Sequence, residues 1–319
     1  MTEQELKSHI IPKSKAVINE VKKAVIGKDD IIIKILLAIA AKGHVLLDDI
    51  PGVGKTTLAV AFSKAMSLDY KRMQFTPDVM PADVTGFSVY NRQSGQFEYK
   101  EGAAMCSLFL ADEINRTSSK TQSALLEVME EGSVTVDGIT RVLPRHFIVI
   151  ATQNPVGSVG TQMLPESQLD RFIIKLSMGY PDLESEVSIL KSKSHSPSDN
   201  SVNAVATRQE IIMLQNAAEE IFTDDRIYHY IASIAAATRK HPMAKLGLSP
   251  RGTVALSSMA KASALLHGRT FVIADDVKYV FQDVCAHRII LTTKAKASGF
   301  TVKMLLDEVI DMTPSPKLL

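Results

Sequence analysis

Short, continuously apolar runs alternate with longer segments of helical spacing along the first 180 residues. Residues 107–111, 147–151 and 172–176 are apolar almost throughout, which is typical of parallel strands buried on both faces. The apolar segment 31–41 contains Lys34 and is far shorter than the ~20 residues needed to cross a bilayer. It therefore indicates a buried helix. The pattern predicts an α/β domain in which helices cover a parallel sheet.

The pattern changes after residue 180, where strand-like runs cease and helical periodicity takes over. The helical segments cover residues 183–192, 208–222, 224–238, 251–267 and 274–287. A length of 319 residues exceeds the usual size of one hydrophobic core. We therefore expect two domains, an α/β domain over residues 1–180 and an α-helical lid over residues 181–319.

Composition narrows the classes of protein that remain. The formal net charge is +1, so bulk electrostatics favours neither a nucleic-acid partner nor membrane binding. Cys106 and Cys285 are the two cysteines, far apart, which argues for a reducing compartment and against a disulfide framework or zinc site. The first ten residues carry charges and no apolar signal core. We expect a cytoplasmic protein without membrane insertion.

In the stretch 46–57, an apolar strand runs into a glycine turn that ends in Lys-Thr. Backbone N–H groups freed by Gly52 and Gly54 can surround phosphates at the positive end of the following helix. Lys55 would reach the β- and γ-phosphates, and Thr56 would bind Mg²⁺. A strict phosphate-binding loop has glycine where this chain has Asp49, and an ordinary strand-to-helix turn is the alternative. The predicted cofactor-binding residues here are Asp49, Pro51, Gly52, Val53, Gly54, Lys55, Thr56 and Thr57.

Two acidic residues, Asp112 and Glu113, follow the buried run 107–111. Ligand sites in open α/β sheets lie at the carboxyl ends of strands. Asp112 would hold the Mg²⁺ shell through water, and Glu113 can accept a proton from the attacking water. The alternative is an acidic pair that caps the next helix. Since two motifs follow in the expected order, the sequence favours hydrolysis of a nucleoside triphosphate.

Asn154 follows the third apolar run and should reach the same edge of the sheet. An amide there can orient the lytic water or contact the γ-phosphate. Taken alone, Asn-Pro after a strand usually marks a turn. Before that run, Asp137 and Gly138 stand between two β-rich segments, which predicts a hairpin over residues 133–143.

These motifs resemble those of the AAA+ ATPases, and within them the MoxR family, over nearly the whole chain. The matching segments are Walker A at 52–57, a helix-2 insertion at 74–86, Walker B at 108–113, a pre-sensor-1 hairpin at 130–143, sensor 1 at Asn154, an arginine-finger segment at 164–172 and sensor 2 at 247–251. The resemblance implies a P-loop NTPase fold, an αβα sandwich with a parallel sheet followed by an all-α lid. It also implies ATP and Mg²⁺ as cofactors, with Thr56 and Asp112 as metal ligands.

The resemblance further assigns catalytic roles to Glu113, Asn154, Arg171 and Arg251. Arg171 would be the finger that reaches a neighbouring subunit's γ-phosphate, although an ion pair with Glu166 or Asp170 is the alternative. Arg251 opens a helix after Ser249-Pro250, so its charge can face the phosphates when the lid closes. Arg116 is a weaker candidate than Arg171 for the interface with the neighbouring subunit.

A stretch before the buried helix, residues 25–28, resembles the family's adenine-contacting segment. Ile26 and Gly27 would contact the base, and Lys28 stands where the family often has glutamine. A helix C-cap at Gly27 is the alternative.

The resemblance to MoxR proteins implies a homo-oligomeric ring, a hexamer, that acts as a chaperone-like remodeller. It would mature a client protein or insert its cofactor, with a partner that bears a von Willebrand factor A domain. A magnesium-chelatase-like motor subunit and a DNA-remodelling AAA+ motor remain as alternatives. The sequence shows no winged helix, zinc motif or basic aromatic surface, which argues against a nucleic-acid partner.

Overall fold

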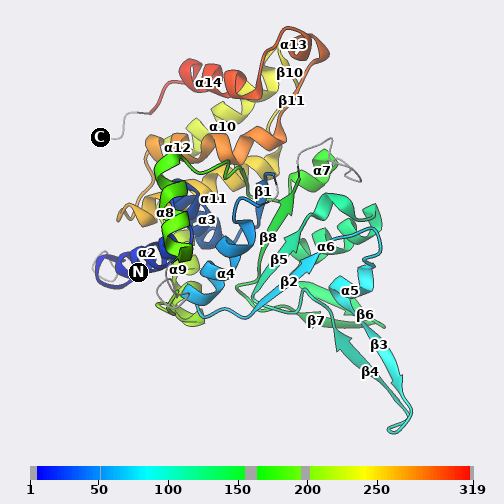
Figure 1. Cartoon of the computed structure of the whole chain (residues 1–319). Coiled ribbons are helices and arrows are strands. Elements are labelled where there is room, and N and C mark those ends of the chain that lie inside the picture. Colours follow the sequence, from blue (N-terminus) through cyan, green and yellow to red (C-terminus); the bar gives the residue numbers. More distant parts are fainter. Residues whose placement is uncertain (1–5, 51, 155–163, 195–201, 317–319) are drawn as a thin grey trace.

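The computed structural model describes residues 6–50, 52–154, 164–194 and 202–316. Within these residues, a five-stranded parallel sheet has the order β2-β5-β8-β1-β9 (Figure 1). Its strands are β1 (Val45–Asp48), β2 (Tyr70–Gln74), β5 (Leu108–Asp112), β8 (Ile148–Gln153) and β9 (Ile174–Leu176). The predicted parallel sheet is confirmed, and the three apolar runs match strands to within one or two residues at each end.

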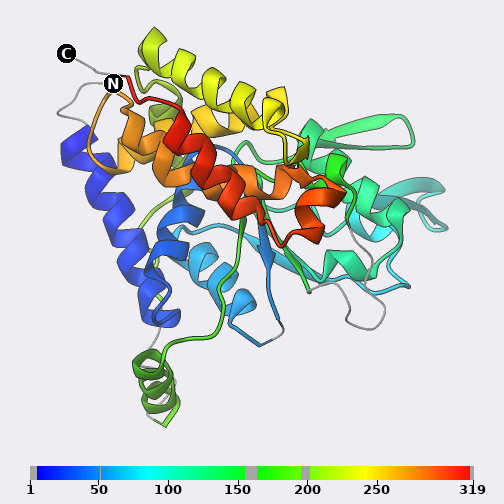
Figure 2. The same cartoon turned by 90° about the horizontal axis from the view of Figure 1, so that it is seen from above.

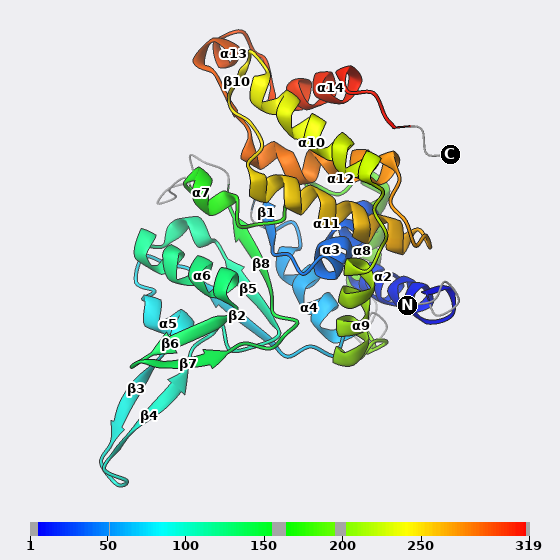
Figure 3. The ribbon, with the colours of Figure 1, turned by 180° about the vertical axis from the view of Figure 1, so that it is seen from behind.

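Helices cover both faces of this sheet because successive strand residues point to opposite sides. Leu108 and Leu110 join one buried hydrophobic cluster, whereas Phe109 and Ala111 join another. On the first face lie α2 (Ile11–Ala24), α3 (Asp29–Ala40) and α4 (Lys55–Ala65), and on the second lie α5 (Pro81–Thr85) and α6 (Ser119–Glu131) (Figure 3). The single turn η1 (Leu6–Ile10) precedes α2, and η2 (Ile114–Arg116) precedes α6. The predicted αβα sandwich is confirmed.

Two antiparallel hairpins extend from the second face. β6 (Ser133–Val136) and β7 (Ile139–Val142) form the predicted hairpin, with Asp137 and Gly138 at φ 53° and 75° in its two-residue turn. The other hairpin, β3 (Gly86–Asn91) with β4 (Gln96–Glu101), projects far from the body of the molecule (Figure 1). The strands β3 and β4 were not predicted from the sequence.

The chain beyond β9 is mainly helical, as predicted. A short α7 (Glu166–Leu169) precedes β9, and the later helices are α8 (Leu183–Ser194), α9 (Arg208–Glu219), α10 (Asp225–Lys240), α11 (Pro250–Leu266), α12 (Ala274–Cys285), η3 (Ala286–Arg288), α13 (Thr293–Ala297) and α14 (Val302–Met312). The lid also contains a two-stranded ribbon, β10 (Ala244–Leu246) with β11 (Ile290–Leu291). The expectation of an all-α lid is therefore corrected by this ribbon, whose strands are too short to leave a periodic signal.

One hydrophobic cluster continues from the sandwich into the lid. Ile35 of α3 belongs to it together with Leu214 of α9 and Leu256 of α11, and α3 contacts both of these helices. The division at residue 180 therefore stays a prediction. Helix α8 differs from the other lid helices, since it projects away from them (the dark green helix at the bottom of Figure 2). No helix in the described ranges is long and apolar enough to span a membrane.

Candidate active site

The carboxyl ends of β1, β5 and β8 meet at one edge of the sheet. Asp48, the last residue of β1, pairs in register with Gln153 of β8, and Ala111 of β5 pairs with Ala151. This register brings the loop after β1, the acidic pair after β5 and Asn154 to the same edge. The predicted convergence of the three motifs is thus present in the fold.

The loop after β1 has the backbone that a phosphate site requires. Gly52 and Gly54 adopt φ of 89° and 96°, a left-handed conformation that glycine tolerates best. Gly54 is the N-cap of α4 and has no side chain that could cap the helix. The N–H groups of the first turn, including that of Thr56, therefore point toward the loop and are not bound by a capping side chain. Val53 packs partly against the hydrophobic cluster. Pro51 lies outside the described residues.

Lys55, the first residue of α4, is buried at this edge with only 7% of its surface exposed. Its Nζ donates a hydrogen bond of 2.6 Å to the backbone oxygen of Asp49. Burial lowers the pKa of Lys55, against the opposing charges of Asp49, Asp112 and Glu113. A buried ammonium beside these carboxylates gains from an anion, because its remaining donors can bind phosphate oxygens.

The carboxylate of Asp49 is bound by the segment after β9. It accepts hydrogen bonds from the backbone N–H groups of Met178 and Gly179, the latter at 3.2 Å and 3.3 Å, and from the hydroxyl of Ser177 at 3.3 Å. Only 6% of the residue is exposed. The side chain of Asp49 therefore holds the segment after β9, and contact of Asp49 with the nucleotide stays a prediction.

Asp112 is held by two residues that were not predicted from the sequence. The hydroxyl of Thr152 donates to one carboxylate oxygen at 2.6 Å, and Arg72 donates to the other at 2.7 Å. Thr152 also accepts the N–H of Glu113 at 2.8 Å. Thr152 could have been found, because it lies at a predicted strand end two residues before Asn154. Arg72 could not have been found in this way, because β2 is a polar strand and the apolar pattern does not reveal it.

Glu113 and Asn154 meet directly. Asn154 Nδ2 donates to one carboxylate oxygen of Glu113 at 3.0 Å, and Arg116 donates to the other at 2.8 Å. Burial raises the pKa of Glu113, but the hydrogen bonds from Arg116 and Asn154 outweigh it and hold this pKa below its usual value. Glu113 also adopts φ 58°, which is uncommon for a side chain of this size and marks functional sites. The candidate finger Arg116 is thus paired with a carboxylate of its own chain.

The donors at this edge fit Mg²⁺. Thr56 offers a hydroxyl and Asp112 a carboxylate, which are hard oxygen ligands, and Mg²⁺ in nucleotide sites takes most other ligands from water and phosphate. The charges of Asp112 and Glu113 act on Lys55, which is next to Thr56 in the chain. Binding of Mg²⁺ by Thr56 and Asp112 stays a prediction. The described residues contain no cluster of three or more metal-binding His, Cys, Asp or Glu side chains.

Arg171 and Arg251 lie together at the opposite edge of the sheet. Both pair with the carboxylate of Glu130, and Arg171 also donates to the backbone oxygen of Leu126 at 2.9 Å. The pocket that contains these three charged residues is also lined by Gly43 and His44, which immediately precede β1. The loop predicted to bind phosphates follows β1, at its other end.

In this structure Arg251 therefore does not face the loop after β1 of its own chain, and its contact with phosphates stays a prediction. The physical reason is the packing of α11, whose first turns line pockets together with Ala41 and Lys42 at the carboxyl end of α3. This packing fixes Arg251 at the amino-terminal edge of the sheet. The alternative partners of Arg171, Glu166 and Asp170, are not the ones it uses.

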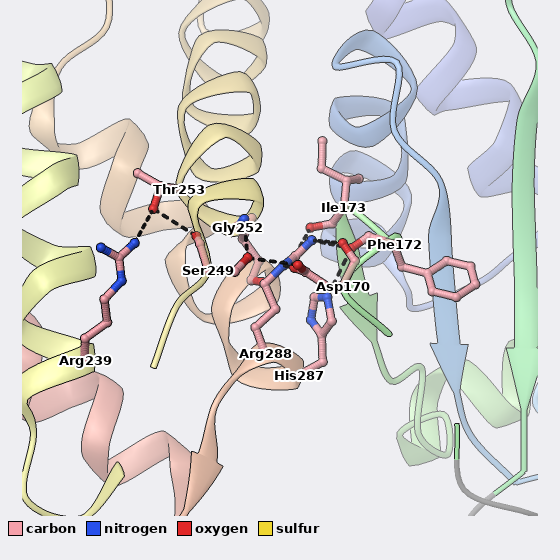
Figure 4. A network of polar contacts seen from close by, with 10 residues as sticks. Asp170, Phe172, Ile173, Arg239, Ser249, Gly252, Thr253, His287 and Arg288 are labelled. Carbon is pink, nitrogen blue, oxygen red and sulfur yellow. Dashed lines mark hydrogen bonds and ion pairs between the residues drawn. The ribbon is translucent and has the colours of Figure 1, made fainter. Parts of the chain in front are cut away.

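Asp170 instead joins the finger segment to the lid (Figure 4). Its carboxylate accepts from Ser249, the N-cap of α11, at 2.9 Å and from Arg288 at 2.6 Å. Arg288 also donates to the backbone oxygens of Asp170, Phe172 and Ile173 at 3.1, 2.6 and 3.1 Å. Its side chain is only 2% exposed. Arg171 and the start of α11 are therefore held in one hydrogen-bonded unit.

The predicted adenine-contacting stretch lies beside the segment after β9. Gly27 has φ 73°, and a Cβ there would collide with the hydroxyl of Ser185 in α8. Lys28 donates to the backbone oxygen of Tyr180 at 2.9 Å. Ile26 is partly buried. Contact of Ile26 and Gly27 with a base stays a prediction.

Comparison with known proteins agrees with this arrangement. Residues 44–174 match the ATPase family associated with various cellular activities (AAA), and residues 236–309 match the AAA lid domain. The chain is 48% identical to the uncharacterized protein YeaC of Bacillus subtilis, covering 94% of this chain and 93% of that protein. It is 35% identical to chaperone MoxR1 of Mycobacterium tuberculosis, covering 94% of this chain and 81% of that protein.

A solved structure shares the whole architecture. A protein assigned as an ATPase from Cytophaga hutchinsonii superposes with a TM-score of 0.92 at 35% identity, covering 98% of each chain. At this identity and coverage the likeness extends over both the sandwich and the lid. With its nucleotide loop, acidic strand end and polar sensor at one edge, the chain belongs to the MoxR family of AAA+ ATPases.

Proposed function

We propose that this protein hydrolyses ATP with Mg²⁺ and that Glu113 is the general base. The observation that carries the proposal is the direct contact of Glu113 with Asn154 beside the buried Lys55. Lys55 and the N–H groups at the start of α4 would bind the phosphates, and Thr56 and Asp112 would hold the metal. Bound Mg²⁺ would neutralise charge on the β- and γ-phosphates.

The environment of Glu113 suits this role. Its lowered pKa keeps the carboxylate charged at neutral pH, so it can accept a proton from water. Asn154 fixes one carboxylate oxygen and can help to orient the attacking water. Arg116 occupies the other oxygen, so it competes with water for the same lone pairs.

We infer that Arg171 and Arg251 act on the nucleotide of a neighbouring subunit. Their edge of the sheet is opposite to the loop that binds phosphates, so neither can reach its own chain's γ-phosphate. The two arginines share the single carboxylate of Glu130, so one positive charge is not neutralised and can attract an incoming phosphate. A closed ring, a hexamer as the family resemblance implies, would bring the two edges together.

The biological role follows from the family and remains a proposal. The relative from Mycobacterium tuberculosis is named a chaperone. We propose that this chain is likewise a chaperone-like remodeller in the cytoplasm, which matures a client or inserts its cofactor. A partner with a von Willebrand factor A domain is part of this proposal.

Two variants test the proposed chemistry. Lys55→Ala should lower the affinity for ATP about tenfold or more, because it removes a charged hydrogen bond to phosphate. Glu113→Gln should bind ATP within about threefold of the parent chain, yet hydrolyse it roughly 10²-fold more slowly, because the base is lost. Nucleotide binding and phosphate release are measured for both. Normal turnover by Glu113→Gln would remove Glu113 from the mechanism.

A further inference from the structure

Asp49 stands where a strict phosphate-binding loop has glycine, and the fold shows what the carboxylate does. The backbone of Asp49 is not left-handed, so this position does not require glycine. Its buried carboxylate accepts the N–H groups of Met178 and Gly179 and the hydroxyl of Ser177. Hydrogen bonds to a charged acceptor are about twice as strong as neutral ones. Asp49 therefore anchors the chain just beyond β9.

The anchored segment, residues 177–182, links the sheet to α8. At its start, Met178 is buried and its side chain approaches the Cβ position of Gly54 to within 4.0 Å. Toward its end, Lys28 holds the backbone oxygen of Tyr180. The linker thus runs from the phosphate loop to the stretch predicted to contact adenine.

Helix α8, which follows the linker, exposes much of its apolar surface. Ser185 is buried beside Gly27, whereas Leu183 and Leu190 are 75% and 66% exposed. Figure 2 shows the helix projecting from the molecule. The main body of the lid is instead clamped to the sandwich by Arg288 (Figure 4). Motion that follows nucleotide binding should therefore be easier in α8 than in the lid body.

We propose that Asp49 is a positioning residue that couples the phosphate loop to α8. Its backbone oxygen accepts from Lys55, and its carboxylate holds the linker, so two hydrogen-bonded steps join the phosphate-binding lysine to the amides of Met178 and Gly179. When phosphates attract the ammonium of Lys55, its hydrogen bond to the backbone oxygen of Asp49 changes. Asp49 then shifts the linker through the hydrogen bonds of its carboxylate. The proposal rests on ATP binding at this loop, as proposed above.

Asp49→Gly gives the sharpest test, because it creates a strict phosphate-loop signature while it removes the anchor. We expect amide exchange in residues 177–182 of the ATP-free protein to become about tenfold faster or more, as loss of charge-assisted hydrogen bonds requires. ATP affinity should stay within about threefold of the parent chain. Any ATP-induced change in distance between probes on α8 and α4, seen in the parent by fluorescence transfer, should be lost.

Two further variants keep the test decisive. Asp48→Asn removes a carboxylate one position earlier that pairs with Lys175 at 2.7 Å and does not touch the linker, so exchange in residues 177–182 should not change. Asp49→Asn preserves the size of the side chain and one acceptor oxygen, and its exchange should be intermediate. It replaces Asp49→Gly if that chain fails to fold.

The outcomes separate this inference from the proposed function. Unchanged linker exchange in Asp49→Gly overturns the anchor, and a strong loss of ATP affinity with unchanged exchange shows that Asp49 binds the nucleotide directly. A retained distance change in Asp49→Gly overturns the coupling. If the parent chain itself binds no ATP, the proposed function fails, and the coupling fails with it. The exchange experiment without ATP then still reports on the anchor.

Discussion

At the scale of single residues, the charge of Glu113 depends on the guanidinium of Arg116. That contact helps to hold the pKa of Glu113 below its usual value, against the effect of burial. Arg116→Ala should therefore raise this pKa, and the carboxylate should become protonated at a higher pH on acidification. The acid limb of the pH profile of ATP hydrolysis should move to higher pH, measured as initial rates of phosphate release.

Lys120→Ala is the matched control for this shift. Lys120 is exposed on α6, four positions further along the chain, so its loss changes the net charge equally without touching Glu113. Its acid limb should stay in place. An Arg116→Ala profile that coincides with the parent profile would show that Arg116 does not set the charge of Glu113.

The sequence allowed the prediction of some site residues and not of others, for physical reasons. Lys55, Glu113 and Asn154 follow apolar runs, and parallel strands end at a common edge, so their meeting could be expected. Arg72 reaches Asp112 from a neighbouring strand whose place in the sheet order is not encoded locally. The contact of Asp49 with the linker likewise depends on the pairing of β1 with β9.

At the scale of elements, the lid is fixed to the sandwich by a buried ion pair between Arg288 and Asp170. The Arg288 side chain is 2% exposed and that of Asp170 is 21% exposed. Burial lowers the pKa of Arg288, and Asp170 opposes this shift. Such a pair is costly to break from one side, because the remaining charge stays buried without its partner.

Arg288→Met should therefore destabilise the protein by roughly 3 to 5 kcal/mol, measured by urea unfolding. Adding Asp170→Asn should recover part of this loss, since it removes the stranded carboxylate. Lys303→Met is the control, because Lys303 pairs with Asp307 on the surface of α14 with 65% of its side chain exposed. Its effect should be much smaller. Equal effects of Arg288→Met and Lys303→Met would contradict the clamp.

Periodicity predicted most helices of the lid but not their orientation. α9, α10 and α12 match the predicted segments to within three residues at each end, because each has a clear apolar face. α14 was missed, as were the strands of the small ribbon. The docking of α11 on α3 joins residues more than 200 positions apart in the chain, so periodicity could not reveal which edge Arg251 would occupy.

At the scale of the whole molecule, the proposed catalytic residues form two groups at opposite edges of the sheet. The phosphate loop, Glu113 and Asn154 lie at the carboxyl edge of the sheet, whereas Arg171 and Arg251 lie at the amino edge. The clamp by Arg288 holds the second group at the amino edge, away from the loop proposed to bind phosphates. Hydrolysis should therefore require two subunits.

The last prediction is that inactive variants restore one another. Arg171→Ala and Arg251→Ala should each lose ATP hydrolysis, by ~10³-fold for the finger. Either one, mixed with Glu113→Gln, should regain activity, because an intact Glu113 site then faces intact arginines on its neighbour. With equal amounts and free exchange, about one interface in four is complete. If mass spectrometry shows exchange and phosphate release stays absent, both arginines act within their own chain or only support the fold, and the shared site is wrong.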